Sequence, residues 1–162
     1  MQPWLAHDFA APQRLDLPTG HHLRQISADD LDLDYPAVMG SQERLWRLFG
    51  PVWGWPPADM TREQDREDLA RHVDEMTRNQ SFNYAVFDAG ETALLGCVYV
   101  DPPESAGGHD AEVVWWVVDG EVGSPIEEAL ETEVPRWLAG RWPFRAPRIV
   151  GRDITWEDWL AE

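Results

Sequence analysis

The sequence contains no lysine, and its thirteen basic residues, all arginines, face thirty aspartates and glutamates. The formal net charge of −17 at pH 7 repels the phosphates of nucleic acids and of anionic lipids. We therefore expect no nucleic-acid partner and no membrane partner, and the charge favours a cationic ligand. An acidic surface adapted to high salt would explain the same composition.

Cysteine is also scarce: the single Cys97 excludes an intramolecular disulfide and a zinc site built from cysteines. Cys97 lies in an apolar run, residues 94–100, and we interpret it as a buried small hydrophobe rather than a reactive thiol. Metal-ligand spacing is missing too, because His21 and His22 are adjacent instead of four residues apart. We predict no metal site, and we interpret His72 as a packed helix residue.

Long hydrophobic runs are absent. No apolar stretch approaches the roughly 20 residues that cross a bilayer, and the amino terminus carries no positive patch ahead of an apolar segment. With 43% hydrophobic residues, including ten tryptophans, the chain is far from a disordered composition. These features predict a folded protein of the cytoplasm.

The first twenty residues contain three prolines and a glycine, which interrupt any regular period. We predict that residues 1–20 form an arm over the fold, held down by Trp4, Leu5 and Phe9. The remaining residues 21–162 fit one domain, since a chain of about 150 residues buries roughly 70% of its unfolded surface on folding.

A capping box at Ser27 and Asp30 predicts a helix start directly after a short strand at 22–26. The helical segment extends to about residue 49 and should be broken at Pro36 and Gly40, with a second piece starting near Ser41. Residues 50–57 contain two glycines and three prolines, so we predict a loop there.

Thr61 with Gln64 forms a second capping box and begins a helix that ends near residue 79. Three strand-like runs follow, at 82–87, 93–100 and 111–118. A turn containing Asp and Gly joins the first two, so we expect an antiparallel hairpin. The third run is nearly continuous in valine and tryptophan, which is typical of a central strand covered on both faces.

The last third of the chain has equally clear signals. Ser124 has the position of an N-cap and Pro125 that of the first helical residue, so a helix should begin there and reach about residue 140. Pro135 should interrupt it. A short strand at 148–151 and a final helical turn capped by Thr155 complete the prediction.

This order of elements resembles the core of the GNAT N-acetyltransferases over roughly residues 23–154. The resemblance implies an α/β fold of the α+β type, with a mixed, mostly antiparallel central sheet flanked by helices. It also implies transfer of an acetyl group from acetyl-CoA to an amine, and the net charge favours a cationic amine. We expect a truncated or divergent member that lacks the last strand pair of the family.

Residues 111–118 look like the family's fourth strand, which splays from its neighbour and pairs its backbone with the pantetheine arm of acetyl-CoA. By location, the resemblance assigns this contact to Trp116, Val117 and Val118. The turn that follows is similar to the family's pyrophosphate loop, in which backbone N–H groups and a helix N-terminus hold the phosphates. The residues that the resemblance implies there are Gly120, Gly123 and Ser124.

This turn departs from the family motif in three ways. Val118 stands where the family has Gln or Arg, and Pro125 removes one backbone donor. Asp119 and Glu121 would repel a pyrophosphate unless they point away. The glycine spacing supports acetyl-CoA binding, and these side chains oppose it.

Glu112 lies where many family members place a carboxylate that accepts the proton of the amine. An ammonium cannot attack a thioester, so a neighbouring carboxylate must take its proton. The resemblance implies that Glu112 is catalytic, and an outward-facing glutamate at a strand start is the alternative. His109 and Asp110 just precede it and are candidates for auxiliary roles. The family's usual general acid, a tyrosine, has no counterpart in residues 154–162.

Two functions remain open at this point. The first is an N-acetyltransferase, and the alternative is a catalytically inactive GNAT-like binding or assembly module whose tryptophans, including those of residues 52–55, contact a partner. Aromatic surface beside a strand edge also predicts a symmetric homodimer, unless the arm covers that edge. The residues that carry the homodimer prediction are Trp142, Phe144, Trp156 and Trp159.

Overall fold

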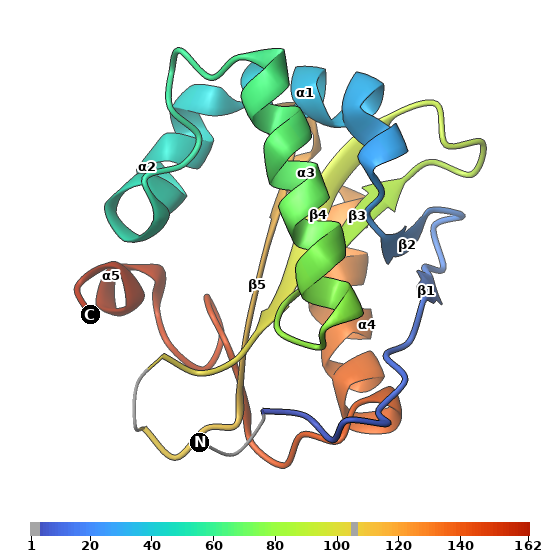
Figure 1. Ribbon diagram of the computed structural model, residues 1–162, viewed down its shortest axis with the longest axis vertical. Coiled ribbons are helices and arrows are strands. Elements are labelled where there is room, and N and C mark those ends of the chain that lie inside the picture. The colour runs from blue at the N-terminus through green and yellow to red at the C-terminus, as the bar shows by residue number, and fades with distance from the viewer. Residues whose placement is uncertain (1–3, 105–106) are drawn as a thin grey trace.

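The computed structural model describes residues 4–104 and 107–162, and a six-stranded sheet forms its centre (Figure 1). The strands are β1 (Arg14–Asp16), β2 (His22–Gln25), β3 (Phe82–Phe87), β4 (Leu94–Asp101), β5 (Ala111–Val117) and β6 (Pro147–Ile149). They follow sequence order across the sheet, and every neighbouring pair is antiparallel except β5 and β6, which are parallel. The sheet is mixed and mostly antiparallel, which confirms the predicted fold class.

Helices cover both faces of this sheet. They are α1 (Leu31–Gly40), α2 (Gln42–Trp53), α3 (Arg62–Thr77), α4 (Pro125–Arg141) and α5 (Trp156–Leu160), with short 3-10 segments η1 (Ala28–Asp30) and η2 (Asp119–Glu121). In Figure 1, α3 crosses in front of β3 and β4, and α4 lies behind the sheet. The ring of Tyr84 on β3 lies 4.8 Å from that of Trp137 on α4, so α4 closes the core on that face.

The predicted helix starts are confirmed. At each of them a hydroxyl accepts a hydrogen bond from a backbone N–H of the first turn, which would otherwise lack a partner. Two of the four are complete capping boxes, with Asp30 and Gln64 as the reciprocal acceptors. The capping residues are Ser27, Thr61, Ser124 and Thr155.

The prediction of a loop over residues 50–57 is wrong for its first half. Helix α2 continues through Pro51 to Trp53 and ends at Gly54, whose φ of 62° is the left-handed conformation that favours glycine. The ring of Trp53 stacks on Phe49 one turn earlier, with 4.7 Å between centroids. Trp53 also meets Tyr99 and Trp159, with 5.3 and 5.7 Å between ring centroids, and this packing offsets the hydrogen bond that Pro51 cannot donate. Pro36 and Pro135 likewise lie inside α1 and α4, which continue past them.

The first twenty residues contain a strand that the sequence analysis does not predict. Strand β1 pairs with β2 at the edge of the sheet, with Arg14 opposite Arg24 and Leu15 opposite Leu23. A three-residue strand has too short a period to recognise, and only its pairing with β2 defines it. The arm prediction is therefore incomplete for residues 14–16.

The aromatic residues behind the homodimer prediction pack largely within one chain. Trp142 and Trp159 expose 5% and 4% of their surfaces. The amino-terminal segment supplies part of the cover, because Trp4 stacks on Phe144 at 5.6 Å and Phe9 meets Trp142 at 5.6 Å. The surface argument for a homodimer is thus wrong at Trp142 and Trp159, where large apolar area is buried inside the chain.

The strand predicted to be central, β5, lies one place from the edge of the sheet, beside β6. Its valines are buried as predicted, whereas Glu112 and Trp115 are partly exposed. Cys97 on β4 is 1% exposed, in agreement with its interpretation as a buried small hydrophobe. Among the described helices, none combines the length and apolar character needed to cross a membrane.

Candidate functional site

Strands β5 and β6 part after three residue pairs. Ala111, Glu112 and Val113 lie opposite residues 147–149, and the N–H of Val150 donates to the carbonyl of Val113 over 3.0 Å. Beyond that bond the chain turns away, so no strand of the described residues lies beside residues 114–117 of β5 on this side. The two strands therefore splay, and backbone groups of β5 are left facing a gap.

The pairing of β5 with β4 shows which backbone groups face the gap. The N–H of Val118 donates to the carbonyl of Leu95 over 2.9 Å, just beyond the end of the ladder. Because the backbone groups of successive residues point to opposite sides of a strand, those of Trp116 also face β4. The N–H and C=O groups of Trp115 and Val117 face the gap. The backbone of Trp116, which we predicted to pair with pantetheine, therefore faces β4, whereas that of Trp115 faces the gap.

A cavity of about 670 Å³ lies along this open side of β5, and we call it the splay cavity. Its walls come from α2, β5, α4, α5 and the segment after β6. They include Arg44, Trp115, Val117, Glu127, Arg152 and Trp156. Arg44 also donates to the carbonyl of Val117 and pairs with Asp119 at 2.6 Å. The carbonyl oxygen of Val117 on the open edge of β5 therefore already accepts a hydrogen bond from Arg44.

The glycine turn between β5 and α4 is closed by its own side chains. Gly123 adopts a φ of 75°, and its N–H donates to a carboxylate oxygen of Glu127 over 3.1 Å. The hydroxyl of Ser124 caps α4 by accepting from the N–H of Glu127 over 3.4 Å. The N–H of Gly123, a group of the kind that holds phosphates in such turns, is thus already bonded to the carboxylate of Glu127. Of the predicted cofactor residues, Trp116 and Val117 line the splay cavity, whereas Val118, Gly120, Gly123 and Ser124 belong to the adjoining turn.

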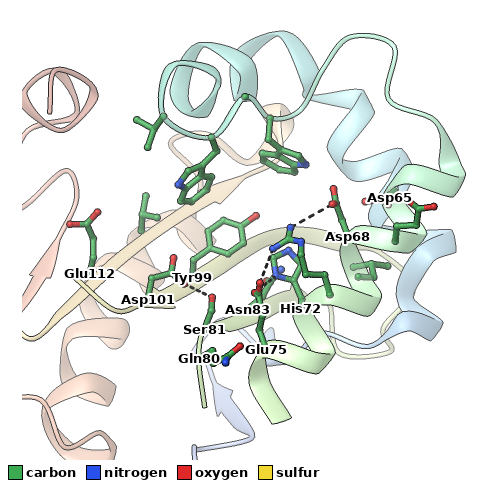
Figure 2. Close-up of a pocket in the computed structure, with 18 of the residues that line it drawn as sticks. Asp65, Asp68, His72, Glu75, Gln80, Ser81, Asn83, Tyr99, Asp101 and Glu112 are labelled. Atoms are coloured by element: carbon green, nitrogen blue, oxygen red, sulfur yellow. Dashed lines mark hydrogen bonds and ion pairs between the residues drawn. The ribbon is translucent and has the colours of Figure 1, made fainter. Parts of the chain in front are cut away.

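A second cavity, of about 790 Å³, lies on the α3 face of the sheet (Figure 2), and we call it the acidic cavity. Its floor is formed by side chains in register on three strands, because Asn83 lies opposite Tyr99 and Tyr99 opposite Val114. Helix α3 and the segment after α2 form the other walls. Its carboxylates include Asp65, Asp68, Glu75, Asp101, Glu104 and Glu112.

Little positive charge balances these carboxylates. Arg71 lines the cavity, but it pairs with Glu75 at 3.1 Å and with Asp68 at 3.5 Å (Figure 2). Burial, assisted by the charge of Arg71, lowers the pKa of His72 to about 4, so this ring is neutral at pH 7. His72 packs on Tyr99 with 6.3 Å between ring centroids, in agreement with its interpretation as a packed helix residue.

The predicted catalytic residue, Glu112, lines the acidic cavity, where it is mostly buried rather than turned to solvent. One of its oxygens accepts from Trp159 Nε1 over 2.6 Å, and the other pairs with Arg148, whose Nε lies at 3.1 Å. His109 Nε2 lies 3.8 Å from the same carboxylate. Both oxygens of Glu112 therefore already accept hydrogen bonds.

A second carboxylate, that of Asp101, lies beside Glu112 across the β4–β5 pair. Its oxygen accepts from the hydroxyl of Ser81 (Figure 2). Burial raises the pKa of Asp101 from 3.8 to about 7, the Ser81 hydrogen bond opposes the rise, and the charges of Glu75 and Glu112 add to it. The sequence analysis missed Asp101, because its position at the end of a strand carries no motif and only the register places it opposite Glu112.

The remaining candidates near Glu112 have structural environments. Asp110 accepts from the backbone N–H groups of Arg145 and Ala146 at 2.7 and 3.0 Å, and so holds the segment that leads into β6. Tyr99 accepts from Trp116 Nε1 over 2.9 Å, and burial raises its pKa well above the usual value. Among residues 4–104 and 107–162, no group of three or more His, Cys, Asp or Glu side chains is arranged to hold a metal ion.

Helix α5 lies between the two cavities. Trp156 lines the splay cavity and Trp159 lines the acidic cavity, with 5.7 Å between their ring centroids. Phe49 of α2 meets both rings, at 5.7 and 6.2 Å. Strand β5 lines both cavities. Glu112 and Val114 line the acidic cavity, and residues 115–117 line the splay cavity. A molecule in each cavity would thus approach the other near the point where β5 and β6 part.

No protein-family model matches this chain, and no curated protein matches it in sequence. Solved structures do match in fold. Ribosomal-protein-S5-alanine acetyltransferase from Vibrio fischeri has a TM-score of 0.54 at 19% identity, over 74% of this chain and 64% of that one. The RimL ribosomal L7/L12 acetyltransferase in complex with coenzyme A has a TM-score of 0.51 at 15% identity, over 77% of this chain and 67% of that one.

A chimeric spermidine N-acetyltransferase, from Vibrio cholerae and hSSAT, has a TM-score of 0.56 at 14% identity, over 80% of this chain and 69% of that one. The chain therefore spans about two thirds of the length of these structures, and slightly less for the Vibrio fischeri protein. The sequence order of the strands, the antiparallel β2–β5 core and the splay of the parallel β5–β6 pair agree with this likeness. The chain has the fold of the GNAT acetyltransferases.

Proposed function

We propose that the protein is an N-acetyltransferase that transfers an acetyl group from acetyl-CoA to a cationic amine. The observation that carries the proposal is the pair of cavities that meet at the splay of β5 and β6. One offers open backbone groups and arginines, and the other offers carboxylates. An anionic acyl donor and a cationic acceptor would each find the chemistry that binds it.

Acetyl-CoA fits the splay cavity better than it fits the glycine turn. The backbone groups of Trp115 and the N–H of Val117 are free of the β4 ladder, so they suit the amides of pantetheine. Arg44 and Arg152 line the same cavity, and within the described residues Arg152 forms no ion pair. Phosphate binding at Gly120, Gly123 and Ser124 stays a proposal, and it requires Glu127 to release the N–H of Gly123.

Acetyl-CoA supplies a thioester carbonyl as the acceptor of the amine lone pair. The chain's own task is to remove a proton from the bound ammonium, and two neighbouring carboxylates are placed for it. We favour Asp101, because a pKa of about 7 lets it hold and release a proton near neutral pH. Glu112, the residue that the family resemblance implies, is the second candidate, and its bonds to Arg148 and Trp159 fix its orientation.

The alternative of an inactive binding module is less well supported. It depends on tryptophans available to a partner, and Trp53 is 36% exposed, but Trp159 is buried and Trp53, Trp55 and Trp159 line the acidic cavity. Trp142 is packed against Phe82, with 5.1 Å between ring centroids. These rings shape a cavity and a core, so they favour a small-molecule site.

The proposal is tested by measuring acetyl-CoA binding and acetyl transfer separately. Acetyl-CoA at 100 times its dissociation constant should stabilise the native state by about 2.7 kcal/mol in a thermal-shift titration. Transfer to a panel of amines is followed by the thiol that coenzyme A releases. Thr132 lines the splay cavity from α4, so Thr132→Trp should abolish the shift by filling the cavity, whereas Thr132→Ser should keep it. No shift with the wild-type protein at millimolar acetyl-CoA would contradict the proposal.

A further inference from the structure

We propose that the acidic cavity selects an acceptor with two cationic groups, a linear diamine or a longer polyamine, and binds its second ammonium at Asn83 and the carboxylates of α3. The inference rests on the proposed function, which supplies the reaction of the first amine of this acceptor. It adds the class of substrate and the residues that choose it.

The cavity contains a buried amide whose oxygen has no donor. Asn83 is 3% exposed and lines the acidic cavity, and its Oδ1 has no hydrogen-bond partner within the described chain. The buried carboxyl of Asp65 is instead hydrogen-bonded to that of Asp34, and burial raises the pKa of both groups. Buried polar atoms in proteins nearly always have a partner, so an unpartnered acceptor in the wall of a cavity indicates a ligand that brings donors. An ammonium brings three donors and no acceptor.

The unpartnered atoms elsewhere are of another kind. They are ring nitrogens of His109, Trp137 and Trp142, and none of these three residues is among those that line the acidic cavity. Among the described residues, Oδ1 of Asn83 is therefore the unpartnered oxygen in the wall of the acidic cavity. An anionic or acceptor-rich ligand would leave it without a partner, whereas a cation satisfies it.

Carboxylates lie near Asn83, and their negative charge adds to the partial negative charge of its unpartnered oxygen. Figure 2 shows Asn83 beside His72 and Glu75, with Asp65 and Asp68 farther along α3. His72 is uncharged at neutral pH, and Arg71 is shared between Asp68 and Glu75. The local field therefore attracts a positive group to this end of the cavity.

Aromatic rings form the wall between the two ends. Trp53, Trp55 and Tyr99 line the cavity, and the rings of Trp53 and Tyr99 meet edge to face at 5.3 Å. Aromatic faces bind ammonium groups through cation–π attraction and pack against methylene chains. A molecule with charged ends and an apolar middle matches that order of surfaces.

The register of the sheet gives the spacing between the ends. Asn83 lies opposite Tyr99, and Asp101 follows Tyr99 by two residues on the same face. Such diagonal neighbours on antiparallel strands are about 7–8 Å apart. One ammonium at Asp101 and another at Asn83 would therefore be separated by a short alkyl chain. A peptide amino terminus would instead place carbonyl acceptors beside Asn83, where acceptors are already in excess.

The experiment compares putrescine with n-butylamine, which has the same four-carbon chain and lacks the second ammonium. Steady-state transfer is measured by release of the coenzyme A thiol. A charge-assisted hydrogen bond in a desolvated site should make kcat/KM about 10- to 100-fold higher for putrescine. Equal values for the two amines, or a higher value for a peptide amino terminus than for putrescine, would overturn the inference.

Variants then locate the selectivity. Asn83→Leu removes the acceptor at nearly constant volume, so the putrescine preference should fall toward one, and Asn83→Asp should keep it. Asp68→Asn should reduce the preference, whereas Asp74→Asn, on the same helix and outside the cavity, is the control for loss of one charge. Selectivity that survives in Asn83→Leu would contradict the assignment of this residue.

Binding without chemistry separates this inference from the proposed function. Putrescine should raise the melting temperature of the protein in the absence of acetyl-CoA, by more than n-butylamine does, and Asn83→Leu should abolish the difference. If no amine is acetylated but this pattern holds, the acetyltransferase proposal is wrong and the diamine site stands. If n-butylamine is acetylated as efficiently as putrescine, the acetyltransferase proposal stands and the diamine site is wrong.

Discussion

The acidic cavity and the splay cavity lie on either side of one short stretch of β5, and they differ in how they obtain their chemistry. The acidic cavity uses side chains, chiefly carboxylates, from α3, β4 and β5. The splay cavity uses backbone groups that β6 leaves unpaired, together with Arg44 and Arg152. The splay cavity also contains Glu127 and Glu131, so its charges balance, whereas carboxylates outnumber cations in the acidic cavity. In a chain of net charge −17, the negative charge is thus distributed unevenly between the two cavities.

The largest expected effect is on proton removal in the acidic cavity. Asp101→Asn cannot accept a proton, so kcat/KM should fall by about 10²–10⁴-fold. For the wild-type protein, kcat/KM should rise with pH up to about 7 and level off above, because the ionised form of Asp101 is the active one. The variant should lose that rise. Rates measured between about pH 5 and pH 9 check both expectations.

Glu112→Gln is the comparison variant, since glutamine can still accept from Trp159 and loses the charge that faces Arg148. A smaller rate loss than that of Asp101→Asn would support Asp101 as the base. An equal or larger loss would indicate that Glu112 removes the proton of the substrate ammonium, as the family resemblance implies.

The next effect is on stability, and its sign follows from the pKa of Asp101. Folding raises this pKa from 3.8 to about 7, so between these values the native chain holds a proton that the unfolded chain has released. The free energy of unfolding should therefore fall as the pH rises through this window. One pKa unit corresponds to about 1.4 kcal/mol, and partial solvent exposure of the carboxylate reduces the total to about 2 kcal/mol.

Asp101→Asn should remove this pH dependence and unfold at higher urea concentration than the wild type near pH 8. Urea titrations at pH 5 and pH 8 measure both. A wild-type protein that is equally stable at the two values would show that the carboxylate titrates normally, and would remove the main reason for preferring it to Glu112.

A smaller effect is expected at the edge of the splay cavity. Glu127→Ala frees the N–H of Gly123 and removes a carboxylate that repels phosphate, so the affinity for acetyl-CoA should rise by about 3- to 10-fold. Glu128→Ala, one residue along α4, is the matched control, because no hydrogen bond from the glycine turn reaches its side chain in the described residues. Isothermal titration measures both. Unchanged affinity in Glu127→Ala would mean that the phosphates bind away from Gly123.

The smallest expected effect concerns the oligomeric state of the protein. The homodimer stays a prediction. The arm covers Trp142 and Phe144 within one chain, so a contact between subunits through the sheet would use an edge strand, β1 or β6. Light scattering at physiological salt distinguishes the two cases. Twice 18.5 kDa would support the homodimer, and 18.5 kDa at all micromolar concentrations would show it to be wrong.

The sequence by itself determined most of the elements, because their signals are local. A hydroxyl at Thr61 or Ser124 caps a helix through an N–H three residues away, and the hairpin of β3 and β4 follows from two strand-like runs and one short turn. The resemblance to the GNAT fold depended on this order and was correct for the fold. The prolines misled, since Pro51 lies inside α2, where the packing of Trp53 on Tyr99 and Trp159 is a tertiary contact.

The site was decided by tertiary structure. Glu112 was found from its position at the head of a strand, but its bonds to Arg148 and Trp159 join it to residues 36 and 47 positions away. Asp101 and Asn83 carried no motif, and they belong to the acidic cavity because strand register sets them on one face. Capping and turns are set within about one helical turn of chain, whereas a cavity is a sum of contacts between distant segments that exist only after the sheet has formed.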